Sequence, residues 1–218
     1  MTTDTNRAHS GPRYTAGSDT VAFVRQTWAG LRVLLVLTVV LGFAYPLAVT
    51  GVAQLAFPWQ ANGSLVTSSG DRVDSPDNEA VGSVLIGQGF DGPEWFHPRP
   101  SAAGDGYDTL ASAGSNLGPL NEDLLATVEE RRSAVAAEEG VDPADVPVDA
   151  LTASGSGLDP DISLAYAQLQ VARIAKERGL TPEQVRVLVD QASVGRDLGV
   201  LGEPRVNVLR LNLALQDA

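Results

Sequence analysis

Residues 33–57 read VLLVLTVVLGFAYPLAVTGVAQLAF, an uncharged stretch of 25 residues near the N-terminus. At about 1.5 Å per residue, a helix of this length spans roughly 37 Å, more than the ~30 Å hydrocarbon core of a bilayer. Trp28 precedes the stretch, and Phe57 and Trp59 end it, where aromatic side chains suit the membrane interface. Pro46 is expected to disturb the helix because it has no backbone N–H. The stretch predicts a single transmembrane helix.

A cleaved signal peptide and a buried core helix are the alternatives for this stretch. Its length exceeds that of an ordinary signal-peptide core or core helix, and no Ala-x-Ala site follows it. Arg25 and Arg32 flank its N-terminal side, whereas the first basic residue after it is Arg72. Because positive residues favour the cytoplasmic side, we expect a cytoplasmic N-terminus and an external C-terminal part. The expected organisation is a disordered cytoplasmic tail at 1–24, a transmembrane anchor at 25–58 and an external domain at 59–218.

Composition excludes several kinds of site. The chain has 218 residues, no cysteine and a formal net charge of −12. Disulfides and zinc–thiolate sites are therefore excluded, and His9 and His97, the only histidines, leave little for a metal site. Residues 1–32 carry a net charge of +2, whereas the remainder carries 11 basic and 25 acidic residues. Such an acidic domain is not expected to bind nucleic acid, because phosphate binding needs clustered Lys and Arg.

The sequence predicts an α+β fold class: one transmembrane helix followed by a single mixed α+β soluble domain. We expect short strands at 64–66, 82–86 and 148–152. Helical spacing of apolar residues predicts helices at 120–139, from an N-cap at Asp159 with Pro160 at the first helical position, and from a capping box at Thr181–Gln184. Residues 205–215 fit both a strand and a helix. Residues 87–118 are dense in Gly, Pro, Ser, Asn and Asp, and so long a structureless stretch is usually functional.

Two glycine-rich stretches invite a nucleotide interpretation. GQGFDG (87–92) matches G-x-G-x-x-G, but no amphipathic helix is expected after it, so we interpret it as a turn. The loop between the expected strand at 148–152 and the next helix could present backbone N–H groups to an anion through Ser154, Gly155, Ser156 and Gly157. No Lys or Arg lies in this loop, and Asp159 would repel a phosphate. A simple strand-to-helix turn is therefore favoured over an anion site.

A polar cluster in the long loop is a second candidate site. Its members are Arg99, Ser101, Tyr107, Asp108, Ser115 and Asn116. Such side chains could perform hydrolysis, but no histidine or lysine is expected nearby as a general base. Asp108 could serve as one, but hydrogen-bonded loop scaffolding or contact with a partner is favoured. The sequence has no G-x-x-x-x-G-K-[ST] motif, and one span cannot enclose a transport pathway. We expect neither a self-contained ATPase nor a channel.

Seven blocks in order carry a family resemblance. They are GSVLIGQ (82–88), RPSAAG (99–104), GYD (106–108), GSNLGP (114–119), VPVD (146–149), TASGSGLDP (152–160) and LGEPRVNVL (201–209). Together they closely resemble the KdpC family, the C subunit of the Kdp potassium-transporting ATPase, from about residue 30 to the end. The family usually has a histidine after the LDP of the sixth block, where this chain has Asp161.

The resemblance implies a non-catalytic accessory subunit of a bacterial high-affinity K⁺ uptake complex. Its expected partners are the P-type ATPase subunit, the potassium-channel-like subunit and the lipid bilayer. No tightly bound cofactor is implied, but the family is described as raising the ATP affinity of the ATPase subunit, with ATP reached through the complex and the Ser154–Gly157 region implicated. It is also described as an external domain, and the arginine asymmetry favours that account. The alternatives are a nucleotide-binding regulatory subunit and a membrane-tethered external hydrolase.

Overall fold

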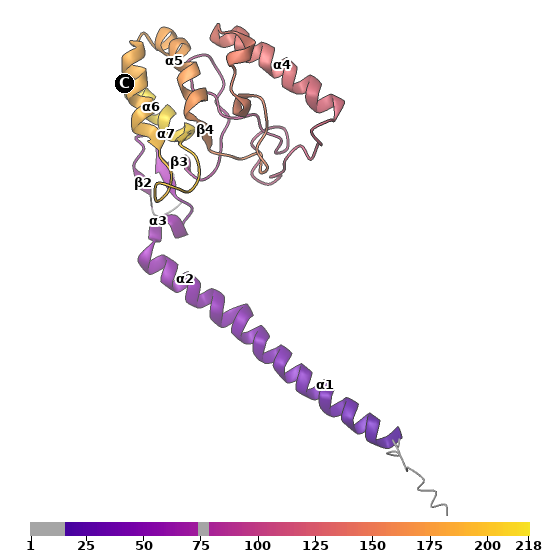
Figure 1. The fold of residues 1–218 in the computed structure, drawn as a ribbon. Coiled ribbons are helices and arrows are strands. Elements are labelled where there is room, and N and C mark those ends of the chain that lie inside the picture. Colours follow the sequence, from indigo (N-terminus) through magenta and orange to yellow (C-terminus); the bar gives the residue numbers. More distant parts are fainter. Residues whose placement is uncertain (1–15, 74–78) are drawn as a thin grey trace, which may run out of the picture. The chain divides into compact units, whose positions relative to one another are not determined.

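The computed structural model describes residues 16–73 and 79–218, which form two compact units that meet in sequence at Phe57 and Pro58. The first unit is one long apolar helix, in which α1 (Ala16–Val39) and α2 (Tyr45–Ala56) are joined by η1 (Val40–Ala44) (Figure 1). Its 37-residue segment Thr20–Ala56 is long and apolar enough to cross a membrane. Of the tail predicted at 1–24, residues 1–15 lie outside the described residues, and the helix already begins at Ala16.

The disturbance expected at Pro46 is a π-helical turn, η1, immediately before it. Proline has no N–H for the helical ladder, and its ring collides with the carbonyl four residues earlier, which here belongs to Gly42. A wider π turn over residues 40–44 separates the two groups and lets α2 start with Pro46 in its first turn. One turn earlier, the Thr38 hydroxyl donates to the Leu34 carbonyl at 2.8 Å, so this polar group needs no partner outside the helix.

The soluble domain begins with a small antiparallel sheet. After α3 (Pro58–Ala61), β1 (Leu65–Thr67) pairs with β2 (Arg72–Val73) on one side and with β3 (Ala80–Ser83) on the other. The Trp59 indole N–H donates to the Leu65 carbonyl at 2.7 Å and fixes the start of this sheet. The strand predicted at 82–86 extends too far, because the chain turns after Ser83, whose carbonyl accepts from the Ile86 amide at 3.3 Å.

Three strands from distant parts of the sequence form a second sheet. β4 (Asp161–Ser163), β6 (Arg205–Asn207) and β5 (Ser193–Val194) pair antiparallel in that order. Their register sets Ile162 opposite Val206, and both side chains are buried. The helix start predicted at Asp159 and Pro160 is therefore wrong. The Asp159 carboxylate instead accepts from the Asp161 N–H at 3.1 Å, and the chain forms β4 before any helix begins.

The strand predicted at 148–152 is also wrong. A short 3₁₀ turn, η3 (Val148–Ala150), occupies this region, and another, η2 (Pro143–Asp145), precedes it. Pro147 lies immediately before η3, and its fixed φ of −64° suits the start of a helical turn. Asp149 in η3 accepts from the Ser163 amide at 2.7 Å and from the Ser163 hydroxyl at 2.9 Å, which ties the turn to β4.

Four longer helices complete the domain: α4 (Glu122–Glu139), α5 (Leu164–Arg178), α6 (Pro182–Ala192) and α7 (Val208–Gln216) (Figure 1). Polar side chains cap their N-termini, and the predicted capping box of α6 is confirmed, with Thr181 and Gln184 each bonding the other's backbone. α4 ends at Gly140, as the sequence predicts, and Gly140 adopts the left-handed conformation that glycine permits. The ambiguous stretch 205–215 contains both predicted structures, since β6 is followed directly by α7.

Two buried amide side chains fix one point of the long loop at residues 87–118. The Asn212 side chain of α7 accepts from the Phe96 amide and donates to the Phe96 carbonyl, both at 2.9 Å. The Gln170 side chain of α5 does the same for His97, at 2.7 and 3.1 Å. Phe96, Gln170 and Asn212 are all 0% exposed. The part of the long loop from Arg99 onward therefore leaves the core from a fixed point.

Candidate functional site

Arg99 connects the long loop to the stretch that precedes β4. Its Nη1 lies 2.9 Å from Asp159 Oδ2, and its Nη2 donates to the Thr152 carbonyl at 3.3 Å. Both side chains of this ion pair are about three-quarters buried. Partial burial strengthens an ion pair relative to one in open water. Arg99 therefore holds together two segments that lie some sixty residues apart in the sequence.

Ser101 and Tyr107 fold the loop back on itself. The Ser101 hydroxyl donates to the Gly157 carbonyl at 2.6 Å and accepts from the amides of Ala103 and Tyr107 at 3.1 and 2.8 Å. The Tyr107 hydroxyl donates to the Arg99 carbonyl. Burial raises the pKa of Tyr107 above its ordinary value, and the negative charge of Asp159 raises it further. The phenol therefore stays protonated and keeps its donor role at neutral pH.

The other three members of the predicted polar cluster lie toward the exposed end of the loop. Asp108 accepts from the Leu110 amide at 2.8 Å, which closes a local turn. Ser115 and Asn116 are exposed, and Asn116 holds the left-handed conformation at φ 55°, which asparagine tolerates better than most residues. The structure thus brings Arg99, Ser101 and Tyr107 together and leaves Ser115 and Asn116 on the surface.

The predicted anion loop, Ser154–Gly157, packs against the long loop and does not form an open anion-binding site. Its carbonyl groups accept hydroxyl hydrogen bonds, Ser156 from Ser112 at 3.0 Å and Gly157 from Ser101. Gly157 is buried at φ 66°, and a Cβ there would come within 2.7 Å of the Ala113 carbonyl oxygen. Gly155 remains exposed. The helix expected to follow this loop, which would have directed its N-terminal dipole at an anion, is replaced by β4.

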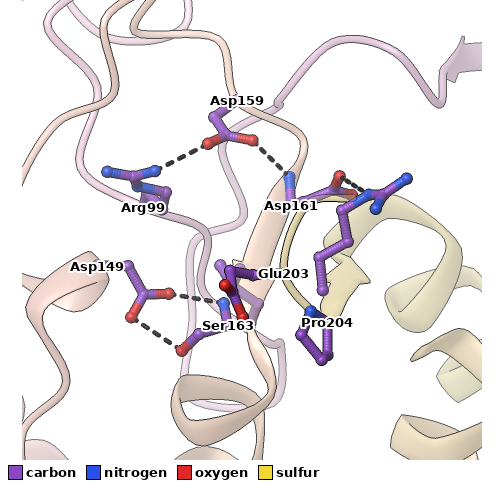
Figure 2. A pocket seen from close by; sticks show the side chains of 10 residues that line it. Arg99, Asp149, Asp159, Asp161, Ser163, Glu203 and Pro204 are labelled. Carbon is purple, nitrogen blue, oxygen red and sulfur yellow. Dashed lines mark hydrogen bonds and ion pairs between the residues drawn. The ribbon is translucent and has the colours of Figure 1, made fainter. Parts of the chain in front are cut away.

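A pocket of about 340 Å³ lies beside the Arg99–Asp159 pair. Figure 2 shows it lined by side chains from the long loop, η3, β4 and the segment before β6. Its ionisable members are two arginines and four acids: Arg99, Arg205, Asp149, Asp159, Asp161 and Glu203. No sequence motif marks Asp149, Glu203 or Arg205 as site residues, because only the pairing of β4 with β6 brings these segments together.

Asp161 occupies the position where the family resemblance predicts a histidine. Its Oδ2 lies 3.2 Å from Arg205 Nε, and its Oδ1 accepts from the Asn207 side chain at 3.1 Å. Burial raises the pKa of Asp161 above its ordinary value, although the hydrogen bond from Asn207 and the charge of Arg205 oppose that rise. Asp161 thus joins β4 to β6 through side chains as well as through backbone pairing.

His97 lines a second pocket, of about 270 Å³, together with Arg99, Ser101 and Tyr107. The expectation that no histidine lies near Ser101 in sequence is wrong, since His97 lies only four residues before it. Both ring nitrogens face acceptors, however: Nε2 is 2.9 Å from the Gly92 carbonyl and Nδ1 is 3.5 Å from the Glu138 carboxylate. The Ser101 hydroxyl is itself committed to Gly157. This arrangement positions loops and does not resemble a nucleophile–base pair.

Within residues 16–73 and 79–218, no group of three or more His, Asp or Glu side chains is placed to hold a metal ion. The G-x-G-x-x-G stretch at 87–92 is followed by turns and irregular backbone, as expected, and no helix begins there.

The profile of one protein family, described as KdpC: K⁺-transporting ATPase, c chain, matches residues 27–217. The chain belongs to the KdpC family. A KdpC relative, the potassium-transporting ATPase KdpC subunit of Kineococcus radiotolerans, is 56% identical over 195 residues, which are 89% of this chain and 95% of the relative. The KdpC subunit of Mycobacterium bovis is 54% identical over 193 residues, 88% and 97% of the two chains. That of Caulobacter vibrioides is 56% identical over 179 residues, 82% and 86%.

Proposed function

We propose that this chain is a non-catalytic accessory subunit that assembles and stabilises a bacterial K⁺-transporting ATPase complex. Its partners would be the ATP-hydrolysing subunit and the potassium-channel-like subunit. The family match over residues 27–217 supports the complex, and the apolar helix Thr20–Ala56 supports an anchor within the bilayer. The charge asymmetry around that helix supports an external position for the soluble domain.

One observation carries the non-catalytic role. The side chains that could have performed chemistry in the long loop are engaged in holding it: Arg99 with Asp159, Ser101 with Gly157 and Tyr107 with Arg99. These bonds hold residues 99–107 against residues 152–159 and leave Ser115 and Asn116 on the surface. A loop fixed in this way loses little conformational entropy when it binds, so it suits a docking surface.

The docking surface is tested with Ser115→Arg. Ser115 is exposed, so a long cation there should leave the fold intact and obstruct a partner. After co-expression with the other subunits and purification in mild detergent, we expect several-fold less ATPase subunit and channel-like subunit to accompany the variant. Gln168→Arg, at an exposed position of α5, is the matched control and should behave as wild type.

Two outcomes would contradict different parts of this proposal. If the wild-type chain does not purify with either subunit, the accessory role is wrong. If wild type and Ser115→Arg retain both subunits equally, the role stands and residues 99–116 are not the docking surface.

An alternative finer role, raising the ATP affinity of the ATPase subunit through the Ser154–Gly157 loop, requires a cytoplasmic domain and therefore competes with the external position. Gly155 supports a direct test because a Cβ there meets nothing within 4 Å. If the loop contacts nucleotide, Gly155→Asp should raise the apparent KM for ATP of the assembled complex about tenfold by charge repulsion, whereas Gly155→Ala should not. If the Gly155→Asp complex assembles fully and its KM for ATP is unchanged, the loop does not contact ATP. The carbonyl groups of Ser156 and Gly157 that accept from Ser112 and Ser101 favour that second result.

A further inference from the structure

A hairpin between β5 and β6 presents an apolar tip to solvent. The Asp197 amide donates to the Leu201 carbonyl at 2.8 Å, and the Leu201 amide donates to the Asp197 carbonyl at 2.9 Å. Inside this bridge, the Gly199 amide bonds the Arg196 carbonyl at 3.1 Å and the Val200 amide bonds the Asp197 carbonyl at 3.2 Å. The tip is therefore a well-bonded turn with a definite shape.

Leu198 at the tip is unfavourable in the isolated domain on two independent counts. Its φ is 54°, the left-handed region in which a bulky side chain is a genuine outlier. Its side chain is also 90% exposed, so the leucine gains no burial in return. Val200 and Leu201 beside it are 72% and 58% exposed. Backbone strain and exposed apolar surface at the same residue are typical of a site that becomes buried against something else.

The charges of the hairpin are already neutralised in its stem. Arg196 Nη2 lies 2.7 Å from Glu203 Oε2, so these two groups form an ion pair across the hairpin. Arg205 lies 3.2 Å from Asp161 and 3.7 Å from Asp197. Figure 2 shows Glu203 and Pro204 at the edge of the pocket beside Ser163, where this stem meets the rest of the domain. The part that projects beyond the stem is uncharged.

We propose that Leu198, with Val200 and Leu201, inserts into an uncharged apolar pocket on another protein subunit of the complex. This inference rests on the proposed accessory function and names a contact that the loop at 99–116 does not include. The composition of the hairpin favours a protein over a lipid surface. Residues 193–204 contain no aromatic side chain, and the one cation among them is paired, so the hairpin lacks the groups that hold a segment at a headgroup layer.

The first test replaces Leu198 by glycine, a residue that adopts positive φ without strain. The full chain in detergent should melt at the same temperature or higher, because strain is removed and no buried contact is lost. The complex with the other subunits should nevertheless dissociate about tenfold more readily, as expected for loss of a central apolar anchor. Leu120→Gly is the matched control, because Leu120 is 88% exposed and lies outside both the hairpin and residues 99–116, and it should leave complex stability close to wild type.

The second test locates the tip. The native chain has no cysteine, so Leu198→Cys can carry a single environment-sensitive fluorophore. We expect its emission to shift to the blue when the chain in lipid nanodiscs binds the other subunits, and to remain that of a water-exposed dye in nanodiscs with this chain alone.

Three outcomes would overturn the proposal. A blue shift in nanodiscs with this chain alone would assign the tip to lipid. A concentration-dependent shift of the chain alone would assign it to a second copy. Equal dissociation of wild type and Leu198→Gly complexes would show that the tip does not dock. Failure of the wild-type chain to join any complex would instead contradict the proposed function.

Discussion

Arg173 joins a buried carboxylate to backbone and side-chain acceptors from other parts of the domain. Its side chain is 6% exposed and its Nε lies 2.9 Å from Glu139, whose side chain is 2% exposed. The same guanidinium donates to the Pro93 and Trp95 carbonyls and to Gln170. Burial raises the pKa of Glu139, and Arg173 opposes that rise. The pair therefore holds the irregular segment around Pro93 and Trp95. Its formation requires the desolvation of two charged groups.

Arg173→Met should lower the free energy of unfolding by about 3–5 kcal/mol, because it leaves the Glu139 carboxylate buried without a cation. Urea denaturation of the full chain in detergent measures the change. Lys176→Met on the same helix is the control: that lysine is 83% exposed, and its loss should alter stability by no more than about 0.5 kcal/mol. A similar small effect for both variants would show that Arg173 and Glu139 do not stabilise the domain as a buried pair.

Asp161 should make the free energy of unfolding of the domain depend on pH. Its pKa is raised in the folded protein, chiefly by burial, so the folded state holds this proton more tightly than the unfolded chain. The resulting stabilisation is complete below the ordinary carboxylate pKa and is lost as pH rises through the raised value. The stability of wild type relative to Asp161→Asn should therefore decline from acidic to neutral pH in urea titrations. A difference that grows with pH would contradict this.

At the scale of elements, the helix ends follow from local sequence, whereas the second sheet does not. Thr181 and Gln184 cap α6 across three residues, and Gly140 ends α4, so a short window contains the whole cause. β4 and β6 have three residues each and lie some forty residues apart. Neither strand is stable alone, and their pairing, with Ile162 opposite Val206, is what turns the expected helix start at Asp159 into a strand.

The α6 cap gives a prediction at this scale. Thr181→Ala removes the acceptor for the Gln184 amide and should reduce the free energy of unfolding by about 1 kcal/mol. Thr127→Ala inside α4 is the matched control, because its exposed hydroxyl bonds only the carbonyl four residues earlier, and alanine is the better helix former. It should be neutral or slightly stabilising under the same denaturation conditions. Equal losses at both positions would mean that the box contributes nothing specific.

Across the whole molecule, the sequence predicts the long apolar helix and the family, but not the cluster of charged side chains beside the long loop. Residues 99–104 and 152–160 are recognisable as blocks, yet the ion pair between Arg99 and Asp159 joins positions sixty residues apart. Its geometry depends on the buried amides of Gln170 and Asn212, which fix where this part of the long loop leaves the core. The apolar hairpin at Leu198 carries no local motif, and only the backbone φ and the exposure of its side chain distinguish it.

The proposed external position of the domain is decided by cysteine labelling in intact cells. Arg25 and Arg32 on one side of the apolar helix, with no basic residue on the other side before Arg72, favour an external C-terminal part. Ser69 lies exposed in the turn between β1 and β2, and the chain has no native cysteine. Ser69→Cys should react with a membrane-impermeant maleimide before lysis, and Ser10→Cys only after it. The reverse pattern would place the domain in the cytoplasm. The Ser154–Gly157 loop could then reach ATP.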